Sequence, residues 1–262
     1  MGSKFCVEGG VKLSSVKQRR QDILHVVRER KTVSVSELKD MFGVSGVTMV
    51  NDLLHLERQG SVLKRHGYIE IRKTALSLDT EIDNYEEKKK IASHALKLIP
   101  DGASLMLYTS TSVLVLARML SARANLNIVT NSFPIAHELA SNKDAKVILI
   151  GGLYDGNTQS TFGEAAVSQL GNYNCDLLFF SCNGVSVSGG LTIDEPYEKT
   201  INIAMLNSTM KKILLMDGSK IGKTRFVPIA PVSAIDCIIT DKSAPGDELE
   251  KLQQDGVQIV VV

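Results

Sequence analysis

From residue 104 onward, short apolar runs alternate with segments whose apolar residues recur at helical spacing. This alternation is typical of successive βαβ units, in which parallel strands are covered by helices on both faces. The segment therefore predicts a doubly wound α/β domain with a mostly parallel sheet. Its expected strands are residues 105–107, 127–129, 147–150, 177–180, 213–216, 235–239 and 257–261.

Loops rich in hydroxyl, amide and glycine residues follow five of these expected strands. Open α/β sheets bind ligands outside the carboxyl ends of their strands. Hydroxyls and free N–H groups at a helix start stabilise a phosphate, a lysine adds positive charge, and asparagine amides suit sugar hydroxyls. We therefore expect a phosphorylated sugar or polyol to bind here. The candidate residues are Thr109, Ser110, Thr111, Ser112, Asn131, Ser132, Gly151, Gly152, Asn183, Gly184 and Lys220.

The first 75 residues follow a different pattern. Apolar residues at helical spacing begin at Val16, and a second, brief helix is expected over residues 37–42, with Leu38 and Met41 facing inward. Ser34 has the spacing of a capping box with Glu37, and Gly43 suits a left-handed helix exit. A third helix, capped by Ser45, is expected to end at Gly60, before a hairpin over residues 61–71. Together these elements predict a winged helix-turn-helix, whose third helix enters the major groove of DNA.

The charge distribution fits such a division. Residues 1–75 carry 14 Lys+Arg and 8 Asp+Glu, whereas residues 76–262 carry 16 and 21, although the whole chain has a net charge of only +1. A basic segment joined to an acidic one indicates that only the first part meets a polyanion. We expect a DNA-binding domain at residues 16–73, a linker at 74–84 and an effector domain at 85–262. The charged run at 86–90 is expected to be a solvated helix start.

The residues of the third helix and of the C-terminal loops resemble those of the DeoR family of bacterial repressors. The helix-turn-helix match consists of Val44-Ser45-x-x-Thr48, Asp52-Leu53, Leu56-Glu57 and Gly60, followed by Arg65-His66-Gly67. The C-terminal match includes Lys90-Ile91-Ala92, Asp101-Gly102, Thr130-Asn131-Ser132, Gly151-Gly152, Asn183-Gly184, Gly190-Leu191-Thr192, Asp217-x-Ser219-Lys220 and Thr240-Asp241. The resemblance implies a C-terminal domain related to sugar-phosphate isomerases, which senses a phosphorylated sugar and thereby releases the repressor from DNA. It also implies DNA contacts from Ser45, Thr48, Asn51, Lys64, Arg65 and His66.

Two departures from the family pattern bear on specificity. The family usually has two arginines before the aspartate, where this chain has Val50 and Asn51. Arginine pairs best with guanine, and asparagine with adenine. The family's Asp-Ser-Gly-Thr-Thr loop is here Tyr108-Thr109-Ser110-Thr111-Ser112. Tyr108 is expected either to stack on a sugar face or to fill the space left by the aspartate.

Two functions are compatible with these patterns. The first is a non-enzymatic transcriptional repressor of a carbohydrate operon, which binds double-stranded operator DNA as a homodimer or homotetramer and responds to a sugar phosphate. The alternative is a sugar-phosphate isomerase with an appended nucleic-acid module. Isomerisation needs a carboxylate base, for which the candidates are Glu164, Asp194, Glu195 and Glu198.

Other function classes find little support. The four cysteines, at positions 6, 175, 182 and 237, form no C-x-x-C pair, and the five histidines have no metal-ligand spacing. The longest apolar runs are too short to span a bilayer, and no secretory signal is recognisable at the start. We expect a cytoplasmic protein without cofactor, metal or membrane partner. Cys182 is expected to be a small packing residue rather than a reactive thiol.

Overall fold

The computed structural model describes residues 16–30, 32–58, 61–65, 67–71, 82–121 and 123–262. The chain divides into two compact units, Met1–Lys73 and Thr74–Val262. Most of the predicted linker, up to residue 81, lies outside the described residues, and so does His66.

The N-terminal unit is a winged helix-turn-helix, as predicted. Its three helices pack on a three-stranded antiparallel sheet in the order β1-β3-β2, around a core that includes Ile23, Leu38, Leu56 and Ile69. The elements are α1 (Val16–Arg30), β1 (Thr32–Ser34), α2 (Val35–Phe42), α3 (Gly46–Arg58), β2 (Val62–Arg65) and β3 (Tyr68–Ile71). β1 was not expected, because three residues are too few for a periodic pattern.

The ends of α2 confirm the sequence signals. Ser34 and Glu37 form a capping box, and Gly43 leaves the helix with φ +60°. The prediction that Met41 faces inward is wrong, because its side chain is 48% exposed. Phe42, which lies four residues after the buried Leu38, packs against the core instead, since it continues the apolar face of the helix.

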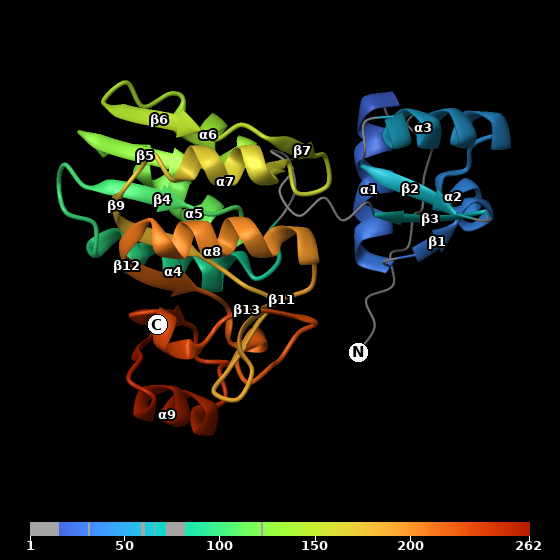
Figure 1. Ribbon diagram of the computed structural model, residues 1–262. Coiled ribbons are helices and arrows are strands. Elements are labelled where there is room, and N and C mark those ends of the chain that lie inside the picture. The colour runs from blue at the N-terminus through green and yellow to red at the C-terminus, as the bar shows by residue number, and fades with distance from the viewer. Residues whose placement is uncertain (1–15, 31, 59–60, 66, 72–81, 122) are drawn as a thin grey trace. The chain divides into compact units, whose positions relative to one another are not determined.

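The C-terminal unit contains a seven-stranded parallel sheet in the order β15-β14-β12-β9-β4-β5-β6 (Figure 1). All seven predicted strands are present. Their bounds are β4 (Ser104–Leu107), β5 (Leu126–Thr130), β6 (Ala145–Leu149), β9 (Cys175–Phe180), β12 (Thr209–Leu215), β14 (Cys237–Thr240) and β15 (Gln258–Val261).

Helices cover both faces of this sheet, which confirms the doubly wound architecture. One core cluster joins the sheet to α4 (Tyr85–Lys97), α5 (Thr111–Leu120) and α6 (Phe133–Leu139). A second cluster on the other face joins it to α7 (Glu164–Leu170), α8 (Lys199–Asn207) and α9 (Gly246–Gln254). Because apolar side chains of each strand alternate between the two clusters, the sheet is buried on both sides.

The strand order reverses between β4 and β9. From β4 the chain moves outward to β5 and β6, and then returns to β9 on the other side before continuing through β12, β14 and β15. The loops after β4 and β9 therefore diverge at their carboxyl ends, and such a topological switch point is where open α/β sheets bind their ligands.

Short strands that the sequence pattern did not reveal lie beside this edge. β7 (Leu153–Asp155) pairs with β8 (Ser160–Phe162), and β10 (Gly184–Ser186) pairs with β11 (Gly190–Ile193), which also pairs with β13 (Val227–Ala230). Three one-turn 3₁₀ helices, Pro196–Glu198, Gly218–Lys220 and Val232–Ala234, complete the unit.

Candidate functional sites

The start of α3 presents three residues that were expected to contact DNA. The Ser45 hydroxyl accepts a hydrogen bond from the Thr48 backbone N–H at 3.1 Å and lies 2.8 Å from the Thr48 hydroxyl. It therefore caps the helix, as the sequence predicts. Asn51, one turn further along, has an exposed side chain.

A buried carboxylate holds α3 against α1. Asp52 is 1% exposed and accepts hydrogen bonds from Arg19 Nε at 2.7 Å and Arg20 Nε at 2.8 Å, both on α1. Burial alone would raise the pKa of Asp52, but the two arginines lower it below its ordinary value. These ion pairs fix the rotation of α3 about its axis. These pairs leave no local signal in the sequence, because the partners lie more than 30 residues apart.

The wing presents two exposed cations. Lys64 and Arg65 end β2, and the turn that follows contains Gly67 with φ +85°, a conformation that favours glycine. The pair suits contact with a phosphate backbone.

In the C-terminal unit, all eleven predicted effector residues lie at the carboxyl edge of the parallel sheet, in the loops after its strands or in the short elements that follow those loops. Residues 109–112 follow β4, residues 131–132 follow β5, and residues 151–152 follow β6. Residues 183–184 follow β9, and Lys220 follows β12.

Several of these side chains bind one another across the loops. Asn131 is fully buried: its Oδ1 accepts from the Thr109 N–H at 3.2 Å, and its Nδ2 donates to the Thr161 carbonyl at 3.2 Å. The Ser160 hydroxyl donates to the Thr109 hydroxyl at 2.6 Å. Asn131 and Thr109 thus join the loops after β4 and β5 to β8, which gives them a structural role in the geometry observed here.

Two serines cap the helices that begin at this edge. Ser110 accepts from the Val113 N–H at 3.1 Å at the start of α5, and Ser132 accepts from the Ile135 N–H at 3.5 Å at the start of α6. Thr111 is half-buried in the first turn of α5, and Ser112 is buried. Because the first N–H groups of a helix lack intrahelical partners, the start of α5 is suited to an anion.

The glycines predicted to lie close to a ligand are instead packed against other parts of the protein. Gly152 has φ +136°, and a Cβ there would lie 2.5 Å from the Phe162 carbonyl oxygen. A Cβ on Gly184 would lie equally close to the Lys223 carbonyl oxygen, whereas the Gly151 N–H binds the side chain of Gln169 at 3.1 Å. The close approach expected of a ligand is thus made by protein at Gly152 and Gly184.

Tyr108 fills space rather than offering a stacking surface. It is 3% exposed at the carboxyl end of β4, and its hydroxyl donates to Glu198 Oε2 at 2.7 Å and accepts from Asn202 Nδ2 at 3.0 Å. Burial, followed by the adjacent Glu198, raises the pKa of Tyr108 well above its ordinary value. Burial also raises the pKa of Glu198, against the lowering effect of the Tyr108 hydroxyl.

The other three carboxylates considered as the base of an isomerase are exposed. Asp194 is half exposed and pairs with Arg225 at 3.3 Å, Glu195 is exposed, and Glu164 is exposed in the first turn of α7. Glu198, the half-buried one of the four, accepts a hydrogen bond from Tyr108.

The charged run at the start of α4 is mostly solvated, as expected, but it contains one buried lysine. Lys88 is 5% exposed, and its Nζ donates to the Asp83 carbonyl at 2.7 Å. Its position three residues before Ile91 places it on the buried face of α4. Burial lowers its pKa, Asp217 acts to raise it, and Lys220 acts to lower it. Lys88 and Lys220 thus lie within electrostatic range of each other at the carboxyl edge.

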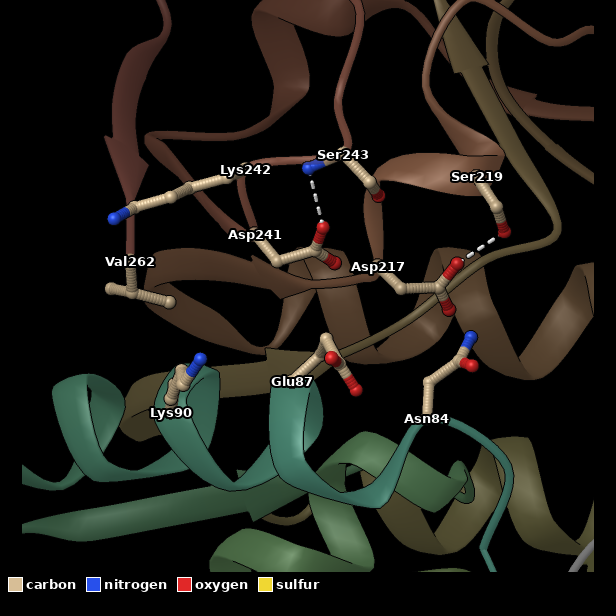
Figure 2. Close-up of a pocket in the computed structure, with 9 residues that line it drawn as sticks. All are labelled: Asn84, Glu87, Lys90, Asp217, Ser219, Asp241, Lys242, Ser243 and Val262. Carbon is tan, nitrogen blue, oxygen red and sulfur yellow. Dashed lines mark hydrogen bonds between the residues drawn. The ribbon is translucent and has the colours of Figure 1, made fainter.

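A cavity of about 310 Å³ lies between the start of α4 and the loops after β12 and β14. Figure 2 shows Glu87 and Lys90 projecting from α4 toward Asp217 and Asp241. Asp241 accepts from the Gly218 N–H at 3.0 Å and the Ser243 N–H at 2.7 Å, and Asp217 accepts from the Ser219 hydroxyl. None of the eleven predicted effector residues lines this cavity. Its lining consists of Asn84, Glu87, Lys90, Asp217, Ser219, Asp241, Lys242, Ser243 and Val262.

The loop after β9 contains two further buried polar side chains. Within the described residues, the Ser181 hydroxyl is one of four buried side-chain polar atoms without a hydrogen-bond partner. Its position directly after β9, beside the switch point, makes it a ligand-facing candidate that composition alone did not distinguish. Burial raises the pKa of Cys182 to about 11, so this thiol is an inert packing group.

The described part of the chain holds no group of three or more His, Cys, Asp or Glu side chains arranged for a metal ion. Within the same residues, no helix is long and apolar enough to cross a membrane.

Comparison with known families decides which family the chain belongs to. A DeoR-like helix-turn-helix domain matches residues 19–75, and the DeoR C terminal sensor domain matches residues 83–242. The chain belongs to the DeoR family of transcriptional regulators.

Members with named roles match nearly the full length of the chain. A putative aga operon transcriptional repressor from Escherichia coli O157:H7 is 28% identical, over 97% of both chains. The glycerol-3-phosphate regulon repressor of Escherichia coli K12 is 27% identical, over 92% of this chain and 97% of its own. Among solved structures, ribose 5-phosphate isomerase A from Methanocaldococcus jannaschii shares 18% identity over 53% of this chain and 55% of its own, with a TM-score of 0.39.

Membership of the DeoR family confirms the first predicted function, a transcriptional regulator, rather than the alternative, a sugar-phosphate isomerase. The chain is a DNA-binding transcriptional regulator with a C-terminal sensor domain, in a family of regulators rather than enzymes.

Proposed function

We propose that this DeoR-family chain represses a carbohydrate uptake or catabolic operon and leaves its operator when a phosphorylated sugar or polyol binds the sensor domain. The names of the two Escherichia coli repressors, one of the aga operon and one of the glycerol-3-phosphate regulon, support a role of this class. The ligand acts by population shift: it binds one conformation of the sensor better, and that conformation presents the DNA-binding domains in an unsuitable arrangement.

The observation that carries the proposal is the convergence of anion-binding groups at the switch point of the sheet. The start of α5, with Ser110, Thr111 and Ser112, follows β4 there, and Lys220 and Lys88 bring positive charge to the same edge. The phosphate binds the first turn of α5 and Lys220. Asn183, Ser181 and the remaining predicted loop residues surround the sugar portion.

The buried Asn131, Thr109 and Ser132 hold these loops in place, and Gly151, Gly152 and Gly184 permit their close packing. Loss of one of these residues therefore reduces ligand binding through the loops.

In the DNA-binding part, α3 enters the major groove with Ser45, Thr48 and Asn51 at its leading end, while Lys64, Arg65 and His66 of the wing contact phosphates. The domain bounds are 16–73 and 85–262, with 74–84 as linker. The regulator acts in the cytoplasm as a homodimer or homotetramer, because two half-sites raise affinity for a palindromic operator.

Calorimetric titration of the full chain with a panel of pentose, hexose and polyol phosphates tests the ligand proposal. One compound of the panel is expected to bind, and Lys220→Met is expected to weaken it by about 10-fold or more, because a charge-assisted contact is lost. Lys223→Met, which changes an exposed lysine outside the predicted set, is the matched control. Absence of binding by every phosphorylated compound, or equal binding by Lys220→Met, would contradict the proposal.

A further inference from the structure

The exposed face of α3 carries two large apolar side chains, which is unusual for a helix that meets a polyanion. Val47 is 73% exposed and Leu54 is 38% exposed, and Asn51 lies between them on the same face, since the spacings are four and three residues. Among the described residues of the N-terminal unit, Val47 is the most exposed large apolar side chain, ahead of Tyr68 at 52%, Val16 at 49% and Met41 at 48%.

The orientation of this face is fixed from behind. Met49, Leu53 and Leu56 are buried in the core of the unit. Asp52 is also buried and pairs with Arg19 and Arg20. Turning Val47 and Leu54 inward would break both ion pairs of Asp52. The two apolar side chains therefore stay on the solvent side of α3.

The chemistry of the face selects among base pairs. Residues 44–57 contain no lysine and no arginine, so this stretch lacks the side chains that pair best with guanine. The apolar group that the major groove offers is the 5-methyl group of thymine, and an asparagine amide matches the N6 and N7 atoms of adenine.

The occupant of this face is duplex DNA. The first 75 residues carry six more basic than acidic residues, and exposed Lys64 and Arg65 lie in the wing of the same unit. In such an arrangement the cations contact the DNA backbone, and the uncharged face of α3 contacts the bases.

We propose that α3 reads adenine–thymine pairs: Asn51 pairs with one adenine, Val47 and Leu54 contact thymine methyl groups of neighbouring pairs, and α3 reads no guanine through residues 44–57. This inference rests on the proposed repressor function, and it names the bases that such a repressor recognises. The affinity for DNA then comes mainly from the wing and other phosphate contacts, and the specificity from methyl groups and one amide.

The test begins with selection of binding sites by the full chain from a library of random-sequence duplexes. We expect an enriched half-site whose centre consists of A·T pairs. Replacing single thymines by uracil removes the 5-methyl group and keeps the base pair. Each methyl group contacted is expected to be worth about 4-fold in affinity, whereas replacement at flanking thymines has no effect.

Two variants assign the contacts to residues. Val47→Ala is expected to abolish the difference between thymine and uracil at one position and to leave binding of the uracil-containing site unchanged. Asn51→Ala is expected to lose about 10-fold in preference for adenine at one position. Met41→Ala, which changes an exposed apolar residue on α2, is the control. Since all three side chains are exposed, unchanged thermal unfolding is expected.

Guanine enriched at the central positions, or equal binding of thymine and uracil sites, would overturn the inference and leave the repressor function standing. A Val47→Ala variant that changes the oligomeric state but keeps the thymine–uracil difference would also overturn it, because the face would then cover protein. If no sequence is enriched at all, the repressor function itself fails together with the inference.

Discussion

The hydroxyl of Tyr108 donates a 2.7 Å hydrogen bond to Glu198 across 90 residues of sequence, which joins the end of β4 to the start of α8. Tyr108 is buried and Glu198 is half-buried, so the hydrogen bond satisfies polar atoms that have little access to water. In the family pattern an aspartate occupies the position of Tyr108. Here the tyrosine reaches Glu198, which ends the 3₁₀ helix before α8, and the first effector loop is tied to the start of that helix.

Tyr108→Phe is expected to lower the free energy of unfolding by about 1–3 kcal/mol, because the half-buried Glu198 loses its hydrogen-bond donor. Urea denaturation followed by circular dichroism measures the change. Tyr154→Phe, at a tyrosine that is 53% exposed, is the control and is expected to be neutral. Equal stability of the two variants would show that the hydrogen bond has no net effect.

The raised pKa of Glu198 gives a pH dependence with a definite sign. Because the folded state favours the protonated carboxyl, its contribution to stability is present below the ordinary value of 4.5 and is lost as the pH rises through the folded-state pKa. Glu198→Gln keeps a neutral acceptor at all pH values. The stability of Glu198→Gln relative to the wild-type chain is therefore expected to increase from pH 4 toward pH 8, as measured by urea denaturation at each pH. A constant or decreasing difference would mean that the carboxylate is not destabilised in the fold.

In the DNA-binding part, the buried Asp52 gives a pH dependence of stability with the opposite sign. Its lowered pKa means that its contribution to stability is present above the ordinary value of 3.8 and is lost as the pH falls through the folded-state value. Asp52→Asn is expected to cost about 1–3 kcal/mol at pH 7, since two partly buried arginines lose their counter-charge. The cost is expected to shrink as the pH falls below 3.8 and through the folded-state pKa of Asp52. Asp40→Asn, at an exposed carboxylate on α2, should show neither effect in the same denaturation series.

Gly152 provides a test of the loop geometry at the sheet edge. Gly152→Ala places a methyl group 2.5 Å from the Phe162 carbonyl oxygen and strains a backbone with φ +136°. We expect a loss of at least about 2 kcal/mol. Gly156→Ala, where an added Cβ meets nothing within 4 Å, is the matched control. If thermal melting temperatures of the two variants agree, the close packing of this loop is not a constraint.

The elements that local signals specify were predictable from the sequence. Strands β4 to β15 of the main sheet, the capping box at Ser34 and the left-handed exit at Gly43 each depend on residues within a few positions of one another. The short strands β1, β7 and β10 were not predictable, because three residues carry no periodicity.

The features that were predicted wrongly, or not at all, depend on tertiary contacts. Met41 is exposed because Phe42 continues the buried face of α2, and Lys88 is buried because it lies three residues before Ile91 on the inner face of α4. The pairing of Asp52 with Arg19, and of Tyr108 with Glu198, joins elements far apart in the chain. Such pairs become visible only once the strand order and the helix packing are known.

The most direct test of the account is a DNA-binding titration on the promoter region upstream of the chain's own operon, at two salt concentrations, with and without sugar phosphates. The account predicts saturable, salt-sensitive binding that one phosphorylated sugar or polyol weakens. Tight binding that no phosphorylated compound changes, or no binding at either salt concentration, would contradict it.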